Sequence, residues 1–287
     1  MNHNVIGHPS IPSSPVIMSV AGFDPSCGAG IAADLKTFAA HNCYGVAAIT
    51  ALTVQNTQGV SLVQPVTVDL LKEQINALLA DGTVRAIKLG MLGSTENAEA
   101  VRDLLDSNPS LPSVLDPVLR SSSGAELADS AAFAFIRDHL MRRVSVTTPN
   151  MDEASALTGM KIENLEGMRT AARKLVESGA KTVVITGGHL DKAVDVYFDG
   201  TDLEIFAADR VKIEHTHGTG CTFASAVAAN LALGRQLRDA VMLAKAYVTE
   251  AIRKSYPVGP GRVPLNHLFR MQQPPRVTDP AVPEPVH

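Results

Sequence analysis

The amino-acid sequence predicts an α/β fold in which helices cover both faces of a mostly parallel sheet. Apolar, strand-like runs alternate with helical patterns from about Val16 to Tyr256, and such alternation is typical of parallel strands joined by helical crossovers. A late Asp-Gly turn predicts an antiparallel hairpin at one edge of the sheet. No internal repeat or break in composition interrupts the pattern. We therefore expect one domain over residues 15–270, with flexible tails at 1–14 and 271–287.

The first half of the pattern predicts two strands and three helices. Residues 15–22 form a short apolar run that ends in a glycine-rich turn, and residues 31–40 follow as a helix. A clearer helix is expected over 68–79, because Leu71, Ile75 and Leu78 recur at helical spacing before Gly82. Residues 86–90 then predict a strand and residues 95–105 a helix.

The second half continues the alternation and then departs from it. Residues 114–117 and 144–147 predict strands on either side of a helix over 130–140, and the β-branched run at 182–186 predicts another strand. The hairpin is expected from 193–198 and 203–206, around Asp199-Gly200. Helices over 220–233 and 237–255 close the fold.

Composition narrows the classes of function. The 287 residues carry a formal net charge of −4, whereas a nucleic-acid partner would require a basic face. No apolar run is long enough for a membrane span, and residues 1–14 lack the features of a signal peptide. Cys27, Cys43 and Cys221 are odd in number and lack metal-ligand spacing, which favours a reducing compartment. We expect a cytoplasmic protein that binds neither nucleic acid nor membrane.

The most informative loop is His-Thr-His-Gly-Thr-Gly-Cys-Thr at 215–222, which leads into an alanine-rich helix. Glycines let the backbone approach a ligand closely, and the free amides of a helix start favour an anion. A phosphoryl group would be stabilised there without a side-chain cation. Cys221 falls in the first turn, where a thiol pKa tends to be lowered. The alternative is an ordinary glycine turn beside a small buried cysteine.

Three further loops fall at predicted strand ends, where open α/β sheets bind ligands. Gly22, Gly28 and Gly30 do not have the spacing of a dinucleotide-binding turn. Asn150 and Glu153, after Pro149, suit either a helix cap or the surroundings of a hydrated Mg²⁺. The loop at 186–189 is either a plain turn or a support for nucleotide phosphates.

Taken together, these segments resemble the hydroxymethylpyrimidine and phosphomethylpyrimidine kinases of thiamine biosynthesis. The matching pieces occur in family order over about 16–269: AGFDPS at 21–26, GAGI at 28–31, ADLKTF at 33–38, ITALTVQNT at 49–57, IKLGML at 87–92, LDPV at 115–118, TPN at 148–150, GGH at 187–189 and THGTGCT at 216–222. The resemblance implies a ribokinase-like three-layer αβα fold and a homodimer that uses ATP and Mg²⁺. It also implies two successive phosphorylations of a pyrimidine substrate, first of its hydroxymethyl group and then of that phosphate.

The resemblance also assigns roles to individual residues. Gln55 is expected to hydrogen-bond the aminopyrimidine, because its amide both donates and accepts. The remaining pocket is expected to be lined by Gly22, Asp34, Met91 and Val118. Asn150, Thr186, Gly188, His189 and Arg120 are expected at the nucleotide phosphates, with Asp116 and Glu153 at the metal. The anion hole and catalytic group are expected from Gly218, Thr219, Gly220 and Cys221.

Two departures from the family pattern bear on the other functions that we considered. Many relatives have a lysine where this chain has Thr186, which removes one phosphate contact and keeps a non-catalytic regulator that binds the pyrimidine open as an alternative. The other alternative is a pyridoxal kinase of the same fold. The loop at 120–124 has no cysteine, and because some members phosphorylate pyridoxal with the help of one, its absence argues against that alternative.

Overall fold

The computed structural model describes residues 14–271 except 121–123, 125–126, 128–129, 189–191, 212 and 214–215. The tails expected at 1–14 and 271–287 fall almost entirely outside the described residues, as does His189. The helices are α1 (Gly30–Ala40), α2 (Val68–Ala80), α3 (Thr95–Ser107), α4 (Ser130–Phe135), α5 (Met151–Thr158), α6 (Leu165–Glu177), α7 (Thr219–Ala232) and α8 (Leu237–Arg253). A π-helical segment, Ile136–Leu140, extends α4.

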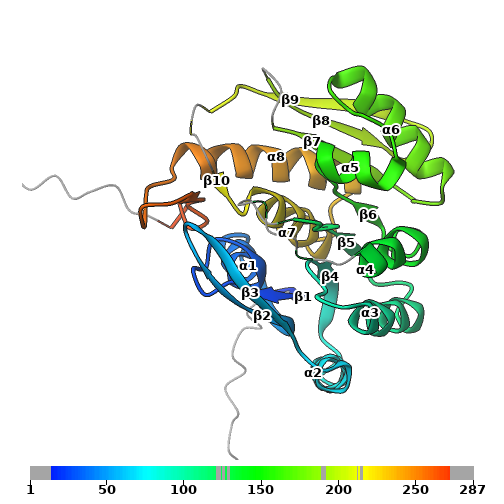
Figure 1. Ribbon diagram of the computed structural model, residues 1–287, viewed down its shortest axis with the longest axis vertical. Coiled ribbons are helices and arrows are strands. Elements are labelled where there is room, and N and C mark those ends of the chain that lie inside the picture. The colour runs from blue at the N-terminus through cyan, green and yellow to red at the C-terminus, as the bar shows by residue number, and fades with distance from the viewer. Residues whose placement is uncertain are drawn as a thin grey trace, which may run out of the picture.

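One large sheet runs through the described part of the molecule (Figure 1). Its strands are β1 (Val16–Phe23), β2 (Tyr44–Asn56), β3 (Gly59–Pro65), β4 (Val84–Leu89), β5 (Ser113–Leu115), β6 (Val146–Thr147), β7 (Val183–Gly187), β8 (Ala193–Phe198) and β9 (Leu203–Ala208). Their order in the sheet is β3-β2-β1-β4-β5-β6-β7-β8-β9. The neighbours from β2 to β7 pair in parallel, so the α/β prediction is confirmed.

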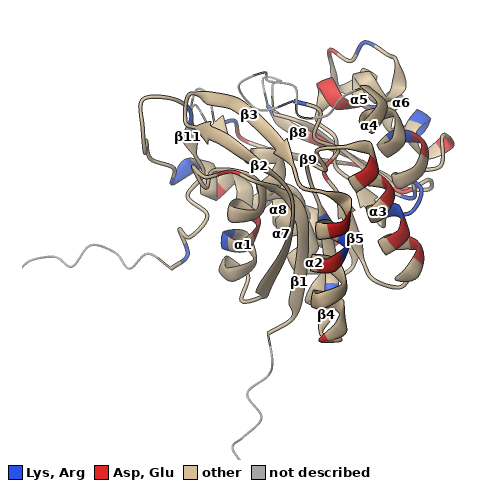
Figure 2. Cartoon of the chain, turned by 60° about the horizontal axis from the view of Figure 1, so that its bottom comes forward, with Lys and Arg blue, Asp and Glu red and all other residues tan. Residues whose placement is uncertain are grey.

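Both edges of the sheet are antiparallel, whereas the sequence predicted this for one. The predicted late hairpin is β8 and β9, which pair antiparallel beyond β7. At the opposite edge, β2 and β3 form a second hairpin that was not predicted. Neither of these two strands contains a charged residue, as Figure 2 shows.

Helices cover the sheet in two layers, which makes the three-layer αβα arrangement (Figure 1). On one face α1, α7 and α8 pack on strand residues such as Ile17, Ala86 and Val184. On the other face α2 to α6 pack on the alternate residues, such as Met18 and Ile87. Because successive strand side chains point to opposite faces, each central strand contributes to both cores and is mostly apolar.

Helix α7 fits its layer through small side chains. Its buried residues include Ala224, Ala226, Ala228 and Ala229, which let it lie close to the sheet. This places the start of α7 directly above the ends of the central strands. A short parallel pair, β10 (Thr216–His217) with β11 (Val263–Pro264), fixes the turn that precedes α7.

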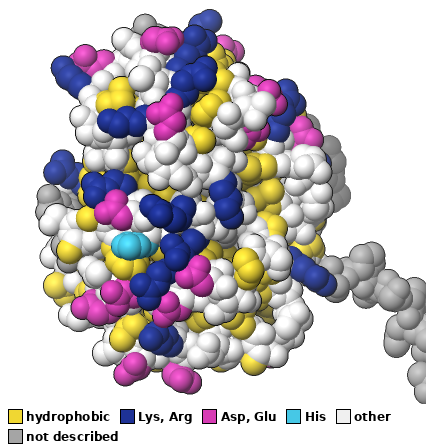
Figure 3. Space-filling model, turned by 90° about the vertical axis from the view of Figure 1, so that its right-hand side faces the viewer, with side chains coloured by type: hydrophobic (Ala, Val, Ile, Leu, Met, Phe, Trp, Pro, Cys, Tyr) yellow, Lys and Arg dark blue, Asp and Glu magenta, His cyan; other side chains and the backbone are white. Residues whose placement is uncertain are grey.

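The surface carries mixed charge. On the face that Figure 3 shows, acidic and basic side chains are interspersed. Surface ion pairs such as Arg143–Asp106 and Arg137–Asp138 join opposite charges on α3 and the α4 region. Among the described residues, none of the helices has the length and apolar character of a membrane span.

Candidate active site

A large cleft opens above the carboxyl ends of the parallel strands, at the start of α7. Of the residues that the sequence singled out, the structure brings fourteen to its walls: Gly22, Gln55, Met91, Asp116, Val118, Arg120, Asn150, Glu153, Thr186, Gly188, Gly218, Thr219, Gly220 and Cys221. They come from loops far apart in the chain, which meet because parallel strands end at the same edge of a sheet.

Asp34 is the exception, and the expectation that it lines the pyrimidine pocket is wrong. Its side chain is fully buried on α1, behind the cleft wall. One carboxylate oxygen accepts from the Ser19 hydroxyl at 2.6 Å and lies 3.0 Å from Lys88 Nζ, and the other accepts from the Ser225 hydroxyl at 2.6 Å. A buried carboxylate whose two oxygens are already bound by these partners is not available to a ligand.

The turn Gly218–Cys221, called the anion turn below, has a backbone suited to binding an anion. Gly218 is the residue before the helix and has φ +80°, which an L side chain rarely adopts. A Cβ atom there would lie 1.8 Å from the carbonyl oxygen of Gly28, so the turn packs against the loop before α1. The amides that follow Gly218 start the helix without a side-chain cap. They are free to donate to an anion, and the helix dipole favours negative charge there.

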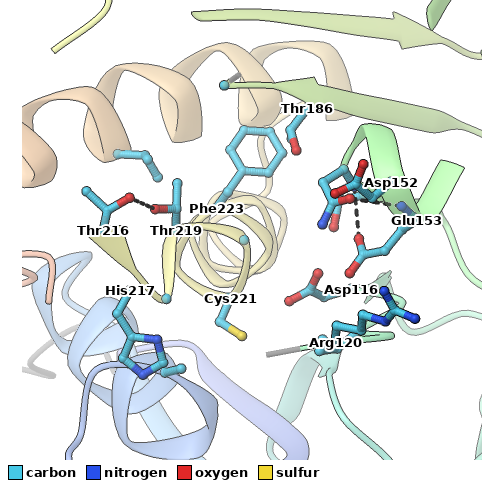
Figure 4. A pocket seen from close by; sticks show the side chains of 18 of the residues that line it. Asp116, Arg120, Asp152, Glu153, Thr186, Thr216, His217, Thr219, Cys221 and Phe223 are labelled. Carbon is cyan, nitrogen blue, oxygen red and sulfur yellow. Dashed lines mark hydrogen bonds between the residues drawn. The ribbon is translucent and has the colours of Figure 1, made fainter. Parts of the chain in front are cut away.

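Cys221 does not behave as the sequence predicted. Its thiol and the Asp116 carboxylate point into the same space, as Figure 4 shows. Burial raises the pKa of the Cys221 thiol, and the carboxylates of Asp116 and Asp34 raise it further, against the opposing effect of Lys88. The expected thiolate is therefore wrong, and the cysteine is a neutral thiol. The helix start alone does not outweigh burial beside two carboxylates.

Asp116 directly follows β5, and its side chain lies at the floor of the cleft. Burial raises the pKa of its carboxyl group, while Lys88 and a hydrogen bond from Cys221 lower it in part. Its Oδ2 atom has no hydrogen-bond partner among the described residues. An added Cβ at Gly220 would lie 3.6 Å from Asp116 Oδ1, so this carboxyl group lies beside the anion turn. A buried carboxylate with a free oxygen can accept a proton or bind a cation.

Asn150 and Glu153 form the start of α5. The Asn150 side chain accepts from the Glu153 N–H at 2.9 Å, and the Glu153 carboxylate accepts from the Asn150 N–H at 2.9 Å. This capping box holds the Glu153 carboxyl group toward Asp116. Burial and then the charge of Asp116 raise the pKa of Glu153 to about 8. The cap and the placement in the cleft, which the sequence offered as alternatives, therefore occur together.

The raised pKa of Glu153 predicts a pH dependence of stability. Because its pKa rises from 4.5 to about 8 on folding, the folded state holds this proton more tightly. The stabilisation is complete below the unfolded pKa and is lost as the pH rises through about 8. We expect the free energy of unfolding to fall on the order of 3 kcal/mol from this group between pH 5 and 8.5. Urea unfolding of the native protein and of Glu153→Gln, which keeps the capping acceptor, would measure it. An equal slope for both proteins would contradict the assignment.

Lys88 is a site residue that was not singled out from the sequence. Burial alone would lower the pKa of Lys88, but the carboxylate of Asp34 and then that of Asp116 raise it. The result is a permanent cation on the cleft floor beneath Asp116 and Cys221. The signal was present in the sequence as one lysine inside the apolar run of β4.

The far end of the cleft lies beyond β7. Thr186 pairs in register with Asp195 of β8, and the Asp195 carboxylate lies 2.9 Å from Lys245 Nζ on α8. Burial raises the pKa of Asp195, and Lys245 opposes this. These two residues line the cleft together with Gly188. They supply one buried ion pair on this side, which the sequence did not indicate.

A family model described as phosphomethylpyrimidine kinase matches residues 24–266, and this range contains every cleft residue named above except Gly22. The chain belongs to the phosphomethylpyrimidine kinase family. It is a phosphotransferase of the thiamine-biosynthesis type, and its ATP-dependent chemistry follows from the family.

The relatives agree with this assignment. The hydroxymethylpyrimidine/phosphomethylpyrimidine kinase of Aquifex aeolicus is 42% identical over 86% of this chain and 97% of its own length. The thiamine biosynthesis bifunctional protein ThiED of Geobacter sulfurreducens is 43% identical over 88% of this chain, which spans 52% of that longer protein. The resemblance in the sequence is thus confirmed at the level of the family.

Solved structures confirm the ribokinase-like fold. An ADP complex of Bacillus subtilis pyridoxal kinase superposes with a TM-score of 0.82 at 35% identity, over 91% of this chain and all of that chain. The phosphomethylpyrimidine kinase of Clostridium difficile gives a TM-score of 0.74 at 38% identity, over 83% of this chain and all of that chain. Both known activities therefore occur on this fold.

The neutral thiol gives a prediction for this phosphomethylpyrimidine kinase family member. In Cys221→Ala we expect kcat to fall about tenfold with KM changed much less, because the thiol borders the anion turn and donates to Asp116. Steady-state kinetics measures this difference. Cys43→Ala is a matched control, since Cys43 is buried among apolar side chains at the other end of α1. An unchanged kcat would show that the Cys221 side chain only fills space.

Proposed function

We propose that this protein transfers the γ-phosphoryl group of ATP to 4-amino-5-hydroxymethyl-2-methylpyrimidine and then to its monophosphate. The observation that carries the proposal is the placement of the anion turn, Gly218–Cys221, beside the Asp116 carboxyl group at the middle of one cleft. An alcohol can enter from the β2 side and a nucleotide from the β7 side. Phosphoryl transfer requires mainly such positioning and charge stabilisation.

The alcohol side suits a flat heteroaromatic ring. Because Gly22 has no side chain, Met91 fits against it. A Cβ atom added at residue 22 would lie 2.2 Å from the terminal methyl group of Met91. Met91 and Val118 supply apolar surface, and Gln55 supplies an amide that both donates and accepts. We place the pyrimidine between them, with its hydroxymethyl group toward the anion turn.

The nucleotide side is the stretch from Asn150 to the β7–β8 region. Asn150, Thr186, Gly188 and Arg120 line it and would contact the phosphates. Thr186 contributes a hydroxyl group and no cation. The charge there is supplied by Arg120 and by the backbone amides of α7.

The carboxyl groups of Asp116 and Glu153 fit a magnesium ion. Among the described residues, no cluster of three or more His, Cys, Asp or Glu side chains is arranged to hold a metal ion. Mg²⁺ usually takes one or two carboxylates and completes its shell with waters and phosphates. The unpartnered Oδ2 of Asp116 and the raised pKa of Glu153 support this, because both carboxyl groups lie buried close together and Lys88 offsets their negative charge only in part. Asp116 and Glu153 would hold bound Mg²⁺, which would supply positive charge to neutralise the phosphates.

The residues of the chain have distinct parts in the transfer. Asp116 is placed to take the proton of the hydroxymethyl group as the oxygen attacks phosphorus. The amides after Gly218 would stabilise the charge that develops on the transferred group. Lys88 remains charged beneath them and offsets the negative charge of Asp116 and Asp34.

The deciding experiment incubates the purified protein with MgATP and one of three acceptors: hydroxymethylpyrimidine, its monophosphate or pyridoxal. Products are resolved by mass. We expect a monophosphate and a diphosphate from the pyrimidine series. No product from any acceptor would overturn the proposal and favour a pyrimidine-binding regulator.

Pyridoxal kinase activity is the second candidate, because the fold superposes well on a pyridoxal kinase, with a TM-score of 0.82. Competition between the two alcohols in the same assay separates them. A pyridoxal product alone would move the assignment to that activity.

We also propose that two copies associate through the outer face of the β2–β3 hairpin. Val54 and Leu62 pair across the hairpin and are 56% and 54% exposed. The two strands carry no charge, and an uncharged apolar edge is typical of a contact surface. Light scattering coupled to gel filtration should give the mass of a dimer, and a monomer mass at micromolar concentration would contradict this. A cytoplasmic location, which the three free cysteines favour, is part of the same proposal.

A further inference from the structure

We propose that His217, held by Asp24, fixes the orientation of the Gln55 amide and thereby makes the pocket select a 4-aminopyrimidine over a 4-oxopyrimidine. The inference rests on the proposed function, because it takes Gln55 as the residue that meets the substrate ring. It adds a specificity-determining residue that does not itself touch the reacting atoms. A chain of contacts runs from Asp24 through His217 and Gln55 to Thr53.

Asp24 is the fixed end of this chain. Its Oδ2 atom accepts from the backbone N–H groups of Gly28 at 3.1 Å and Ala29 at 2.9 Å, and lies 2.9 Å from His217 Nε2. Its Oδ1 atom accepts from the backbone and the hydroxyl group of Ser26. Burial would raise the pKa of Asp24, but the bonds from His217 and Ser26 lower it below its usual value. Asp24 is therefore a carboxylate that accepts on both oxygens.

His217 must then donate from Nε2. A carboxylate has no hydrogen to give, so the Nε2 atom beside Asp24 carries one, whether the ring is neutral or charged. The ring is 6% exposed. It packs on Gly28, where an added Cβ would lie 2.4 Å from His217 Cδ2. The ring has no room to turn, and its donor is fixed in space.

This donor decides the orientation of Gln55. The Gln55 amide nitrogen is placed 3.1 Å from His217 Nε2, which sets two donors against each other. The amide oxygen is placed 3.3 Å from the Thr53 hydroxyl, whose hydrogen goes to the Phe23 carbonyl oxygen at 2.9 Å. Turning the amide by half a rotation puts its oxygen at His217 and its nitrogen at Thr53. The single Nε2 hydrogen is then shared between Asp24 Oδ2 and the amide oxygen, and the amide nitrogen donates to the Thr53 oxygen. No two donors face each other, so this is the orientation we assign.

In this orientation the Gln55 amide has one lone pair on its oxygen and one N–H left for a ligand. The positions of this acceptor and this donor are fixed relative to the pocket. A 4-aminopyrimidine edge presents a donor next to the ring-nitrogen acceptor, whereas a 4-oxopyrimidine edge presents an acceptor next to an N–H donor. A freely turning amide would serve both edges. An amide held by His217 serves one, and the other edge would leave buried polar groups unpaired.

The test compares His217→Asn with His217→Gln. The asparagine amide ends near the position of Nδ1 and removes the donor to Gln55, whereas the glutamine amide nitrogen reaches the position of Nε2 and restores it. The native protein and both variants are assayed with MgATP on the 4-amino substrate and on its 4-oxo analogue. We expect His217→Asn to lower the ratio of the two kcat/KM values by about 10- to 100-fold. His217→Gln should keep the ratio within about threefold of the native value.

A structural role for His217 predicts something else. If His217→Asn lowers kcat/KM equally for both compounds and leaves the ratio unchanged, the inference is overturned. Thr53→Val is a control on the half-buried hairpin, because it removes the contact of the amide nitrogen but keeps the His217 donor. Its ratio should stay within about threefold of the native value, and a fall as large as that expected for His217→Asn would overturn the inference. A native protein that phosphorylates neither compound would overturn the proposed function and this inference together. An active native protein whose ratio is unchanged by His217→Asn would overturn the inference alone.

Discussion

Asp116→Asn is expected to lower kcat by about 100- to 10,000-fold, the range found when a positioned base is removed. Asparagine has the same shape but cannot take the proton of the substrate hydroxyl group. Folding should not suffer, because the native carboxyl group is buried with an unpartnered Oδ2 and a raised pKa. We therefore expect an unchanged or higher melting temperature, measured by calorimetry beside the kinetics.

A titration with Mg²⁺ separates the two parts that Asp116 could have. Loss of a base lowers kcat at every Mg²⁺ concentration, whereas loss of a metal ligand raises the Mg²⁺ concentration needed for half-maximal rate. Asp195→Asn is a matched control, since Asp195 is equally buried in the cleft but is paired with Lys245 on the nucleotide side. If Asp116→Asn retained the native kcat at all Mg²⁺ concentrations, the carboxyl group would have no part in the chemistry.

Gly218→Ala is expected to reduce kcat by about 100- to 1,000-fold, as losing one donor of an anion site does. The added methyl group would overlap the Gly28 carbonyl oxygen, and the φ of +80° would be strained. The turn must therefore move, and the amides that start α7 move with it. Isothermal titration with a nucleotide and steady-state kinetics would report the change.

Gly234→Ala isolates the effect of the close contact. Gly234 follows α7 with φ +79°, but no atom lies within 4 Å of an added Cβ. Both variants carry the same backbone strain, of about 1 kcal/mol. Gly234→Ala should keep the native kcat, and equal kinetics for the two variants would refute the role of the Gly218 turn.

The fold was predictable where a local pattern carried it. Apolar runs such as β1 and β7 and the spacing in α2 sufficed. The β2–β3 hairpin was missed because its exposed face carries Leu52 and Val54, which removes the alternation of apolar and polar residues. Helix α6 was missed although Met168, Ala171 and Leu175 mark its buried face at helical spacing.

The site was predictable where a loop carries its own chemistry. The turn at Gly218 and the cap at Asn150 depend on neighbouring residues, so the sequence indicated them. Lys88, by contrast, meets Asp34 54 residues away, and that contact exists only in the folded sheet. The pKa of Cys221 was misjudged for the same reason, since burial beside Asp116 and Asp34 outweighs the helix start.

The hydrogen bond from His217 to Asp24 joins residues 193 positions apart, which has a consequence for how the protein is made. Ribosomes synthesise about 5–20 residues per second, so β1 and its loop wait many seconds for the segment that completes them. Until α7 and α8 emerge, the face of the sheet that they cover exposes Ile17, Ala86 and Val184 to water. The nascent chain therefore spends most of its synthesis with an aggregation-prone surface, and chaperones have that interval in which to bind it.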